Sequence, residues 1–286
     1  MKLLALDSSA APASCALWED GRILAEFYIH VKLTHSQTLM PMVQGMLDAA
    51  GLAPAQLDGF AVSAGPGSFT GVRIGVAALK GMAWPLDKPC AAVSTLEAMA
   101  ENLRGADRPE RTAASGILVG ADGPSAPETD GGTGHPAGCA GPDTVNAEEA
   151  DALLCCVMDA RCNQVYNALF LRRKGEICRL CPDRALLIDQ LAQSLEETRP
   201  AGKVPIILTG DGAELCYRKL ADRIPGLRLA PEPVRFQRAS GVAAAAARAF
   251  ARGDTVSAEA LQPIYLRLPQ AERELKKKLS QQQEEK

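Results

Sequence analysis

A glycine-rich segment, Gly65-Pro66-Gly67-Ser68-Phe69-Thr70-Gly71, joins an apolar run to a stretch that ends at Trp84-Pro85. A strand, a glycine-rich turn and a helix N-terminus together present backbone N–H groups to an anion. The candidate phosphate-binding residues are Gly65, Gly67, Ser68 and Thr70. The segment is not a Walker A loop, and Gly71 comes one residue too late for the dinucleotide-binding fingerprint. A tight turn that needs positive φ and close packing explains the same glycines equally well.

Two further segments carry polar residues at the end of an apolar run. Asp7-Ser8-Ser9 follows the first run, where Asp7 could face a nucleotide phosphate or its Mg²⁺, or could simply cap a turn. Gly210-Asp211-Gly212 follows a run near the C-terminal end and is a candidate for a second phosphate loop. Ser63 lies in a sequence like a nucleophile elbow, but the one histidine after it is His135, which argues against a serine hydrolase.

Metal chemistry has little support in the sequence. The three histidines, His30, His35 and His135, form no His-Glu-x-x-His pattern. Cys178-x-x-Cys181 is half of a zinc site, which Cys155, Cys156 or Cys162 could complete, but structural thiols are the favoured interpretation. The sequence therefore predicts no catalytic residue and no metal site.

Composition sets the general class of the protein. The chain has 286 residues, of which 47% are hydrophobic and 23% are charged, and its net charge is −3. This balance is typical of a globular protein and argues against a surface that grips nucleic acid directly. No apolar run approaches the roughly 20 residues of a membrane span. Nine cysteines without an export signal predict a reducing, cytoplasmic location.

Hydrophobic periodicity predicts an alternating α/β order in the first part of the chain. A hairpin is expected around Asp20-Gly21, and a helix is expected over His35–Ala50. Because Pro41 falls inside that helix, we expect it to start at Thr38 rather than at a capping box of Thr34 and Gln37. The expected strands are residues 2–6, 14–18, 22–29, 58–63 and 90–93, and the further helices are 72–84 and about 94–103.

The rest of the chain predicts a second lobe after an interruption. Residues 105–149 are rich in Gly and Pro and poor in large apolar side chains, which predicts a flexible insertion. The expected organisation is an N-terminal lobe over 1–104, this insertion, a second lobe with a returning C-terminal helix over 150–268, and a polar tail over 269–286. Expected strands are 153–159, 165–171 and 204–209, and expected helices are about 188–197, one after Gly212, and 239–252.

Several segments together resemble the TsaB (YeaZ) family, the non-catalytic partners in bacterial synthesis of threonylcarbamoyladenosine on tRNA. The glycine loop extended through Val72-Arg73-Ile74-Gly75 is the most specific of them. The others are Leu4–Ser9, His35–Pro41, Lys80-Gly81, Asp159-Ala160-Arg161 with Val165-Tyr166, Gly210–Gly212 and Pro263–Arg267.

The resemblance implies an α/β fold of the actin/Hsp70-like ATPase type, with two lobes of βββαβαβα order. In the catalytic paralogue TsaD two histidines bind metal, and the alignment places Thr95 and Met99 at those positions, which implies a lost metal site. It also implies a scaffold and activating subunit that pairs with TsaD and with the ATPase TsaE. The resemblance implies that tRNA binds only to the assembled complex and that this chain holds no tightly bound cofactor. ATP or ADP would act at the level of the complex. An autonomous ATPase or kinase of the same fold is the alternative, and a metalloprotease is a weaker one.

The first two helices are expected to form the partner surface, both for TsaD and for a homodimer of the isolated chain. Glycines such as Gly71 and Gly75 would thin one helix so that another chain approaches closely, and methionines on the other helix suit a surface that repacks. The expected interface residues are His35, Leu39, Met42, Met46, Gly71, Val72, Ile74, Gly75 and Leu79.

Overall fold

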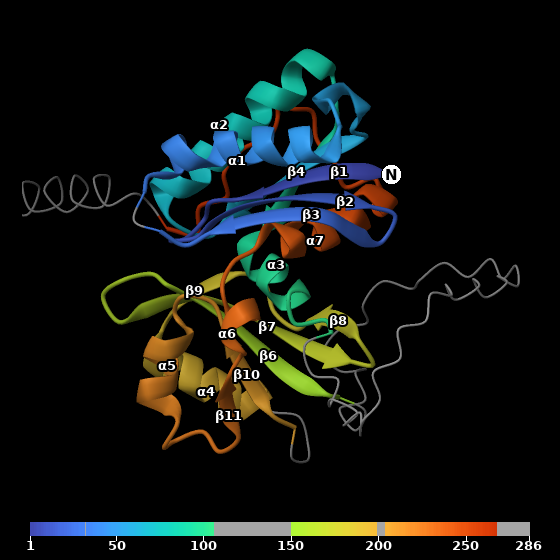
Figure 1. Ribbon diagram of the computed structural model, residues 1–286. Helices are drawn as coiled ribbons and strands as arrows, with labels where there is room; N and C mark the ends of the chain where they lie inside the picture. Colours follow the sequence, from blue (N-terminus) through green and yellow to red (C-terminus); the bar gives the residue numbers. More distant parts are fainter. Residues whose placement is uncertain (32, 106–149, 199–203, 268–286) are drawn as a thin grey trace, which may run out of the picture.

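The computed structural model describes residues 1–31, 33–105, 150–198 and 204–267. Within these ranges the chain forms two lobes, each built on its own sheet, one above the other in Figure 1. The expected flexible insertion beyond Gly105 and the expected polar tail lie outside the described residues. No helix in the described ranges is long and apolar enough to cross a membrane.

The first lobe is a five-stranded sheet in the order β3-β2-β1-β4-β5. The chain starts with β1 (Lys2–Asp7), β2 (Ala13–Glu19) and β3 (Arg22–Ile29), which are antiparallel. β4 (Gly59–Gly65) then pairs with β1, and β5 (Cys90–Ser94) pairs with β4, both in parallel. The turn between β2 and β3 has positive φ at Asp20 and Gly21, as its sequence predicts.

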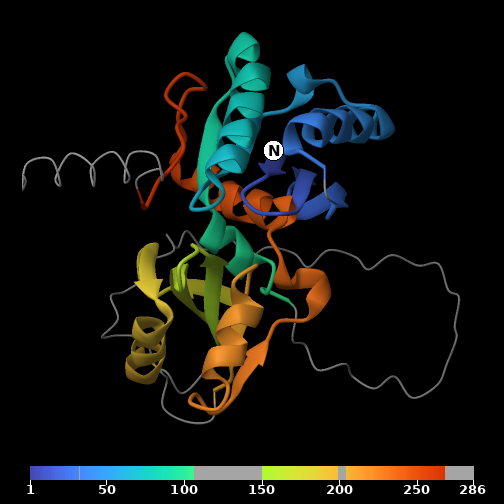
Figure 2. The same cartoon turned by 90° about the vertical axis from the view of Figure 1, so that its left-hand side faces the viewer.

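Helices cover both faces of this sheet (Figures 1 and 2). α1 (His35–Ala50) and α2 (Phe69–Ala83) pack on one face, and short 3-10 turns follow them at Pro54–Gln56 and Trp84–Leu86. α7 (Ala239–Arg252) returns from the far end of the chain to pack on the other face beside α3 (Thr95–Glu101). The core of the first lobe is therefore completed by residues more than 140 positions away from its last strand.

The second lobe repeats the topology of the first. Its strands are β6 (Ala152–Asp159), β7 (Gln164–Arg173), β8 (Glu176–Arg179), β9 (Arg184–Leu187), β10 (Ile206–Thr209) and β11 (Leu227–Leu229). The order β11-β10-β6-β7-β8 mirrors that of the first sheet, with β9 also pairing with β7. α4 (Ile188–Thr198), α5 (Ala213–Leu220) and the short α6 (Glu232–Arg235) complete it. This duplicated unit confirms the expected α/β fold of the actin/Hsp70-like type.

Most of the expected elements are confirmed, but the expected start of α1 is wrong. The helix begins at His35, not at Thr38, and Pro41 lies inside it. Thr34 is the residue before the helix, but its side chain makes no capping hydrogen bond, so the alternative, a capping box of Thr34 and Gln37, does not form either. Strands β8, β9 and β11 and helix α6 are short elements that the sequence pattern did not predict.

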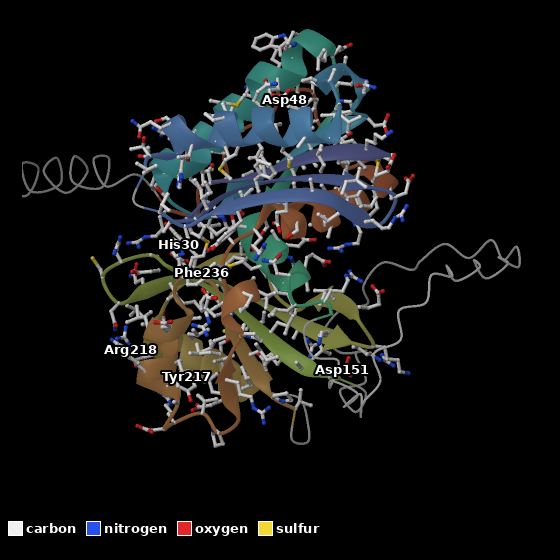
Figure 3. All side chains as sticks on the ribbon, in the orientation of Figure 1. His30, Asp48, Asp151, Tyr217, Arg218 and Phe236 are labelled. Atoms are coloured by element: carbon white, nitrogen blue, oxygen red, sulfur yellow. The ribbon has the colours of Figure 1, made fainter. Side chains whose placement is uncertain are left out.

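α3 lies at the boundary between the lobes, with apolar side chains on both of its sides. Leu96 and Met99 belong to a buried cluster that also contains Ala10 from the β1–β2 loop and Met158 from the end of β6. At one edge of this boundary His30 and Phe236 form an edge-to-face pair with ring centroids 5.2 Å apart (Figure 3). The lobes therefore meet through a packed apolar interface.

Candidate functional site

The glycine loop between β4 and α2 is packed against the β1–β2 loop of the same lobe. Ser68 N donates to Ser9 O at 2.7 Å, and Gly71 N donates to Ser68 Oγ at 3.3 Å. A side chain on Gly67 would collide with the backbone oxygen of Ser9. Because these two N–H groups already have acceptors in the chain, the contacts favour the tight-turn alternative over an anion site. Thr70 is exposed in the first turn of α2.

Gly65, at the start of this loop, is constrained both by its backbone conformation and by a close contact with another segment. Its φ is +128°, a conformation that side chains rarely adopt, and an added Cβ would collide with the carbonyl oxygen of Ile264. The segment that contains Ile264 thus crosses directly over the loop, and Ile264 N donates to Ala64 O at 2.7 Å. Glycine is required here for close approach of the chain's own backbone.

Asp7 is a buried carboxylate with three donors around it. Its Oδ1 accepts from Ser9 N at 2.9 Å and from Ser9 Oγ at 2.7 Å, and its Oδ2 accepts from Ser63 Oγ at 2.5 Å. Burial raises the pKa of Asp7, and the hydrogen bonds from Ser63 and Ser9 act in the opposite direction. Ser8 is also buried, and its Oγ donates to Gly71 O at 2.9 Å. These contacts favour the turn-capping alternative for Asp7 over a role toward a phosphate or Mg²⁺.

The second candidate loop, Gly210–Gly212, is engaged within the second lobe. Gly210 N donates to Arg235 O at 2.7 Å, and Gly212 N donates to Val157 O at 3.3 Å. Gly210 has a φ of +105°, and a Cβ there would lie 2.9 Å from the sulfur of Met99. Met99 belongs to the apolar cluster at the lobe boundary, so the second candidate loop packs directly against that cluster.

Asp211, between these two glycines, has a carboxyl group whose pKa is raised above its usual value. The residue as a whole is exposed, but the surrounding protein desolvates the carboxyl and raises its pKa to about 6, while a hydrogen bond from Gln237 Nε2 at 3.0 Å acts the other way. Asp159 nearby raises the pKa further and Arg161 lowers it. A carboxylate with a raised pKa disfavours the folded state once it is ionised.

Asp211→Asn is therefore expected to stabilise the protein at neutral pH but not in acid. The unfolded carboxyl titrates near 3.9, so both states are protonated below about pH 4 and the Asp contributes no penalty there. As pH rises through the folded-state pKa of about 6, wild type loses stability that the Asn variant keeps. Thermal melts of both proteins from pH 4 to pH 7.5 should show a difference in Tm that grows from about pH 4 to about pH 6 and then levels off. A difference that is constant with pH would contradict the assignment.

Thr95 and Met99, which align with the metal ligands of the paralogue, lie inside the packed boundary. Both are fully buried, and Thr95 Oγ1 has no hydrogen-bond partner among the described residues. Cys181 Sγ accepts from Leu169 N at 3.2 Å. Across the described part of the chain, no three His, Cys, Asp or Glu side chains are grouped so that they could hold a metal ion. The expectation that the chain binds no metal stays a prediction.

The side chains expected at a partner interface belong instead to the core of the first lobe. Their 3/4 spacing marks the face of each helix that packs on the sheet, and it is this face that is buried. His35 and Ile74 are only partly buried, and His35 Nε2 lies 2.7 Å from Ala10 O. The residues corrected in this way are Leu39, Met42, Met46, Val72 and Leu79, each at most 9% exposed.

The expectation for Gly71 and Gly75 was also wrong. A Cβ on Gly71 would collide with Ser8 O, and a Cβ on Gly75 would lie 2.5 Å from Ser8 Oγ and 3.2 Å from Val62 Cγ2. Both glycines let α2 approach β1 and β4 of its own lobe, not a second chain. Gly81 on the same helix has no atom within 4 Å of an added Cβ and is exposed.

The outward faces of α1 and α2 carry a different set of residues. Trp84 is 61% exposed at the end of α2, and Met40 is 41% exposed on α1, where Asp48 points to solvent (Figure 3). Exposed aromatic side chains at such positions are typical anchors of protein interfaces. The sequence analysis does not identify Trp84 as an interface residue, because it treats Trp84 only as the end of a helix. The signal is that Trp84 lies outside the 3/4 spacing of the buried residues of α2, which predicts an exposed side chain.

A pocket lies at the start of α1, beside the boundary between the lobes. It has a volume of about 510 Å³ and is lined by Ala11, His30, Val31, Leu33 and His35. Val31 and Leu33 are 51% and 59% exposed. The described residues that line it are mainly apolar, and there is no cluster of charged groups among them that would bind a phosphate.

Comparison with known proteins relates both the sequence and the fold to one family. A family model described as TsaD, tRNA N6-adenosine threonylcarbamoyltransferase, matches residues 23–121. The Bacillus subtilis tRNA threonylcarbamoyladenosine biosynthesis protein TsaB is 31% identical over 201 residues, which are 70% of this chain and 69% of that protein. Escherichia coli TsaB is 29% identical over 267 residues, covering 93% of this chain and 95% of its own length.

A solved structure agrees with the sequence matches. YeaZ from Pseudomonas aeruginosa superposes with a TM-score of 0.64 at 27% identity and covers 93% of this chain and 99% of its own. The similarity therefore covers most of the length of both chains.

Proposed function

The chain belongs to the TsaB family of tRNA threonylcarbamoyladenosine biosynthesis proteins, and from this premise we propose that it is the non-catalytic subunit that pairs with a TsaD-like transferase and activates it. A TsaE-like ATPase joins this pair, tRNA is bound by the assembled complex, and the complex works in the cytoplasm. ATP or ADP acts at the level of the complex.

The non-catalytic assignment rests on the hydrogen bonds that the two candidate loops already make within the chain. Ser68 N and Gly210 N, which an anion would need, donate to oxygens of the chain itself. Asp7, the one fully buried carboxylate at the glycine loop, has its acceptor sites filled by serine groups. Apolar side chains from both lobes also pack together at the lobe boundary. These contacts support a scaffold over an autonomous ATPase or kinase.

The partner surface in this proposal is the outward face of α1 and α2. This face is exposed along both helices and carries Met40, Ala77, Gly81 and Trp84. Because it lies on the side of the helices away from the sheet, a partner can bury it without disturbing the core of the lobe. The same face serves for a homodimer when the chain is alone, since a two-fold axis can pair one patch with itself.

Gly81→Arg is expected to abolish both the complex with the TsaD-like protein and the homodimer while the fold is kept. The added side chain enters open space on α2, so it leaves the core intact but places a charge in the contact, where an unpaired buried charge costs several kcal/mol. The measurement is size-exclusion chromatography with light scattering, for the chain alone and mixed with the TsaD-like protein from the same source.

Gly105→Arg provides the matched control. It introduces the same side chain at an exposed glycine that also has open space around it, but away from α1 and α2. It should form both complexes as wild type does. Normal complexes with Gly81→Arg would place the interface elsewhere, and ATP turnover by the isolated chain would support the enzyme alternative instead.

A further inference from the structure

A short segment after α7, Pro263–Arg267, contacts both lobes, and we refer to it as the strap. The residues that lead into the strap are bound to the first lobe. Val256 forms a β-bridge with Cys90, and Lys80 Nζ donates to Glu259 O at 2.9 Å and to Leu261 O at 3.1 Å. The strap itself then crosses the glycine loop, where Ile264 N donates to Ala64 O. Its starting point is therefore part of the first lobe.

An aromatic and cationic stack fixes the middle of the strap to α2. The ring of Tyr265 stacks on Phe69 with centroids 4.7 Å apart. Arg73 Nε donates to Tyr265 Oη at 2.6 Å, and its guanidinium lies 5.5 Å from the centroid of that ring. All of these contacts are within the first lobe, so Tyr265 does not join the lobes by itself.

The end of the strap binds the second lobe. Arg267 Nη1 donates to Ala160 O at 2.9 Å, in the loop between β6 and β7. Leu266 packs against the buried cluster at the lobe boundary, which contains Ala10 of the first lobe and Cys156 of the second. Arg267 thus binds the second lobe and Leu266 packs at the lobe boundary, while the two residues before them contact the first lobe.

We propose that the strap is an intramolecular latch that holds the lobes closed on each other over the glycine loop. Opening of the lobes would separate the apolar cluster, break the Arg267 bond and uncover Cys156. A segment bound to both lobes in this way holds them in one arrangement. The proposal concerns the isolated chain and does not depend on the identity of any partner.

Two neighbouring cysteines distinguish separation of the lobes from unfolding of the second lobe, because their side chains lie on opposite faces of the sheet. Cys156 is fully buried in the boundary cluster, whereas Cys155 is fully buried in the cluster on the opposite face of the same sheet, under α4 and α5. Separation of the lobes exposes the first thiol and leaves the second covered. Unfolding of the second lobe exposes both.

The test is the rate of labelling by N-ethylmaleimide in the full chain, with the labelled site identified by fragment-ion mass spectrometry. In wild type both thiols should label slowly. In Leu266→Ala/Arg267→Ala, Cys156 should label roughly tenfold faster, because a hydrogen bond from a charged donor contributes about a factor of ten to such an equilibrium. Cys155 should keep its wild-type rate. If the double variant does not fold, Arg267→Ala alone serves for the same comparison with a smaller increase.

Tyr265→Phe is the matched control, since it removes the bond from Arg73 but keeps the ring stack on Phe69 and the Ile264 N–Ala64 O bond, which still anchor the strap to the first lobe. It should leave both labelling rates unchanged. An unchanged Cys156 rate in the double variant would overturn the latch. Equal acceleration of Cys155 and Cys156 would also overturn it, because the strap would then stabilise the second lobe as a whole.

Discussion

Gly75→Arg is expected to abolish folding of the chain rather than only to block its association. Gly75 lies where α2 packs on β1 and β4, and a Cβ there would be 2.5 Å from Ser8 Oγ. That hydroxyl cannot move away freely, because it is buried and donates to Gly71 O. A guanidinium group at this point would also be buried without a partner, which costs several kcal/mol against a total stability of about 5–15 kcal/mol. Soluble yield and the cooperative thermal transition, followed by circular dichroism, should both be lost.

The control for this prediction is Gly81→Arg on the same helix. It adds the same charge and volume six residues further on, where an added Cβ meets no atom within 4 Å. It should fold with a melting temperature close to that of wild type. If Gly75→Arg also gave a normal melt, the packing of α2 described above would be wrong.

The second large effect is expected for Glu101→Gln at the end of α3. The side chain of Glu101 is fully buried, and its carboxylate lies 2.7 Å from Arg248 of α7 and 2.8 Å from Arg104. The change keeps the shape but removes the charge that neutralises two partly buried arginines. Breaking a buried ion pair in this way costs about 3–5 kcal/mol. The measurement is the free energy of unfolding from urea titration.

Glu176→Gln is the matched control for this ion pair. Glu176 also binds Arg104, at 3.0 Å, but its side chain is 73% exposed. Exposed pairs contribute about 0–1 kcal/mol, so this variant should unfold at nearly the wild-type urea concentration. Equal losses for the two glutamates would show that burial does not govern the strength of these pairs.

Local sequence patterns predicted the regular elements well, because the period of apolar residues reflects which face of an element is buried. The β2–β3 hairpin, both long helices of the first lobe and the strand before the glycine loop follow from this rule. Short elements such as β11 have too few residues to establish a period, so the pattern could not predict them. The start of α1 was misplaced because Pro41 does not exclude a helical turn before it, and in that turn His35 Nε2 lies 2.7 Å from Ala10 O, a contact that the local sequence does not show.

The sequence by itself determined that this protein has two α/β lobes and a glycine loop like that of its family, since periodicity, turn residues and motif are local properties. Only the tertiary structure decided what each glycine approaches. Gly71 and Gly75 face the chain's own β1 region, while Gly81 on the same helix faces open space. The structure also decided that Ile264 covers Gly65, a contact between residues 199 positions apart. The position of a glycine in the sequence indicates that another group packs closely there. Which group this is depends on contacts between distant parts of the chain, and those form only when the whole chain folds.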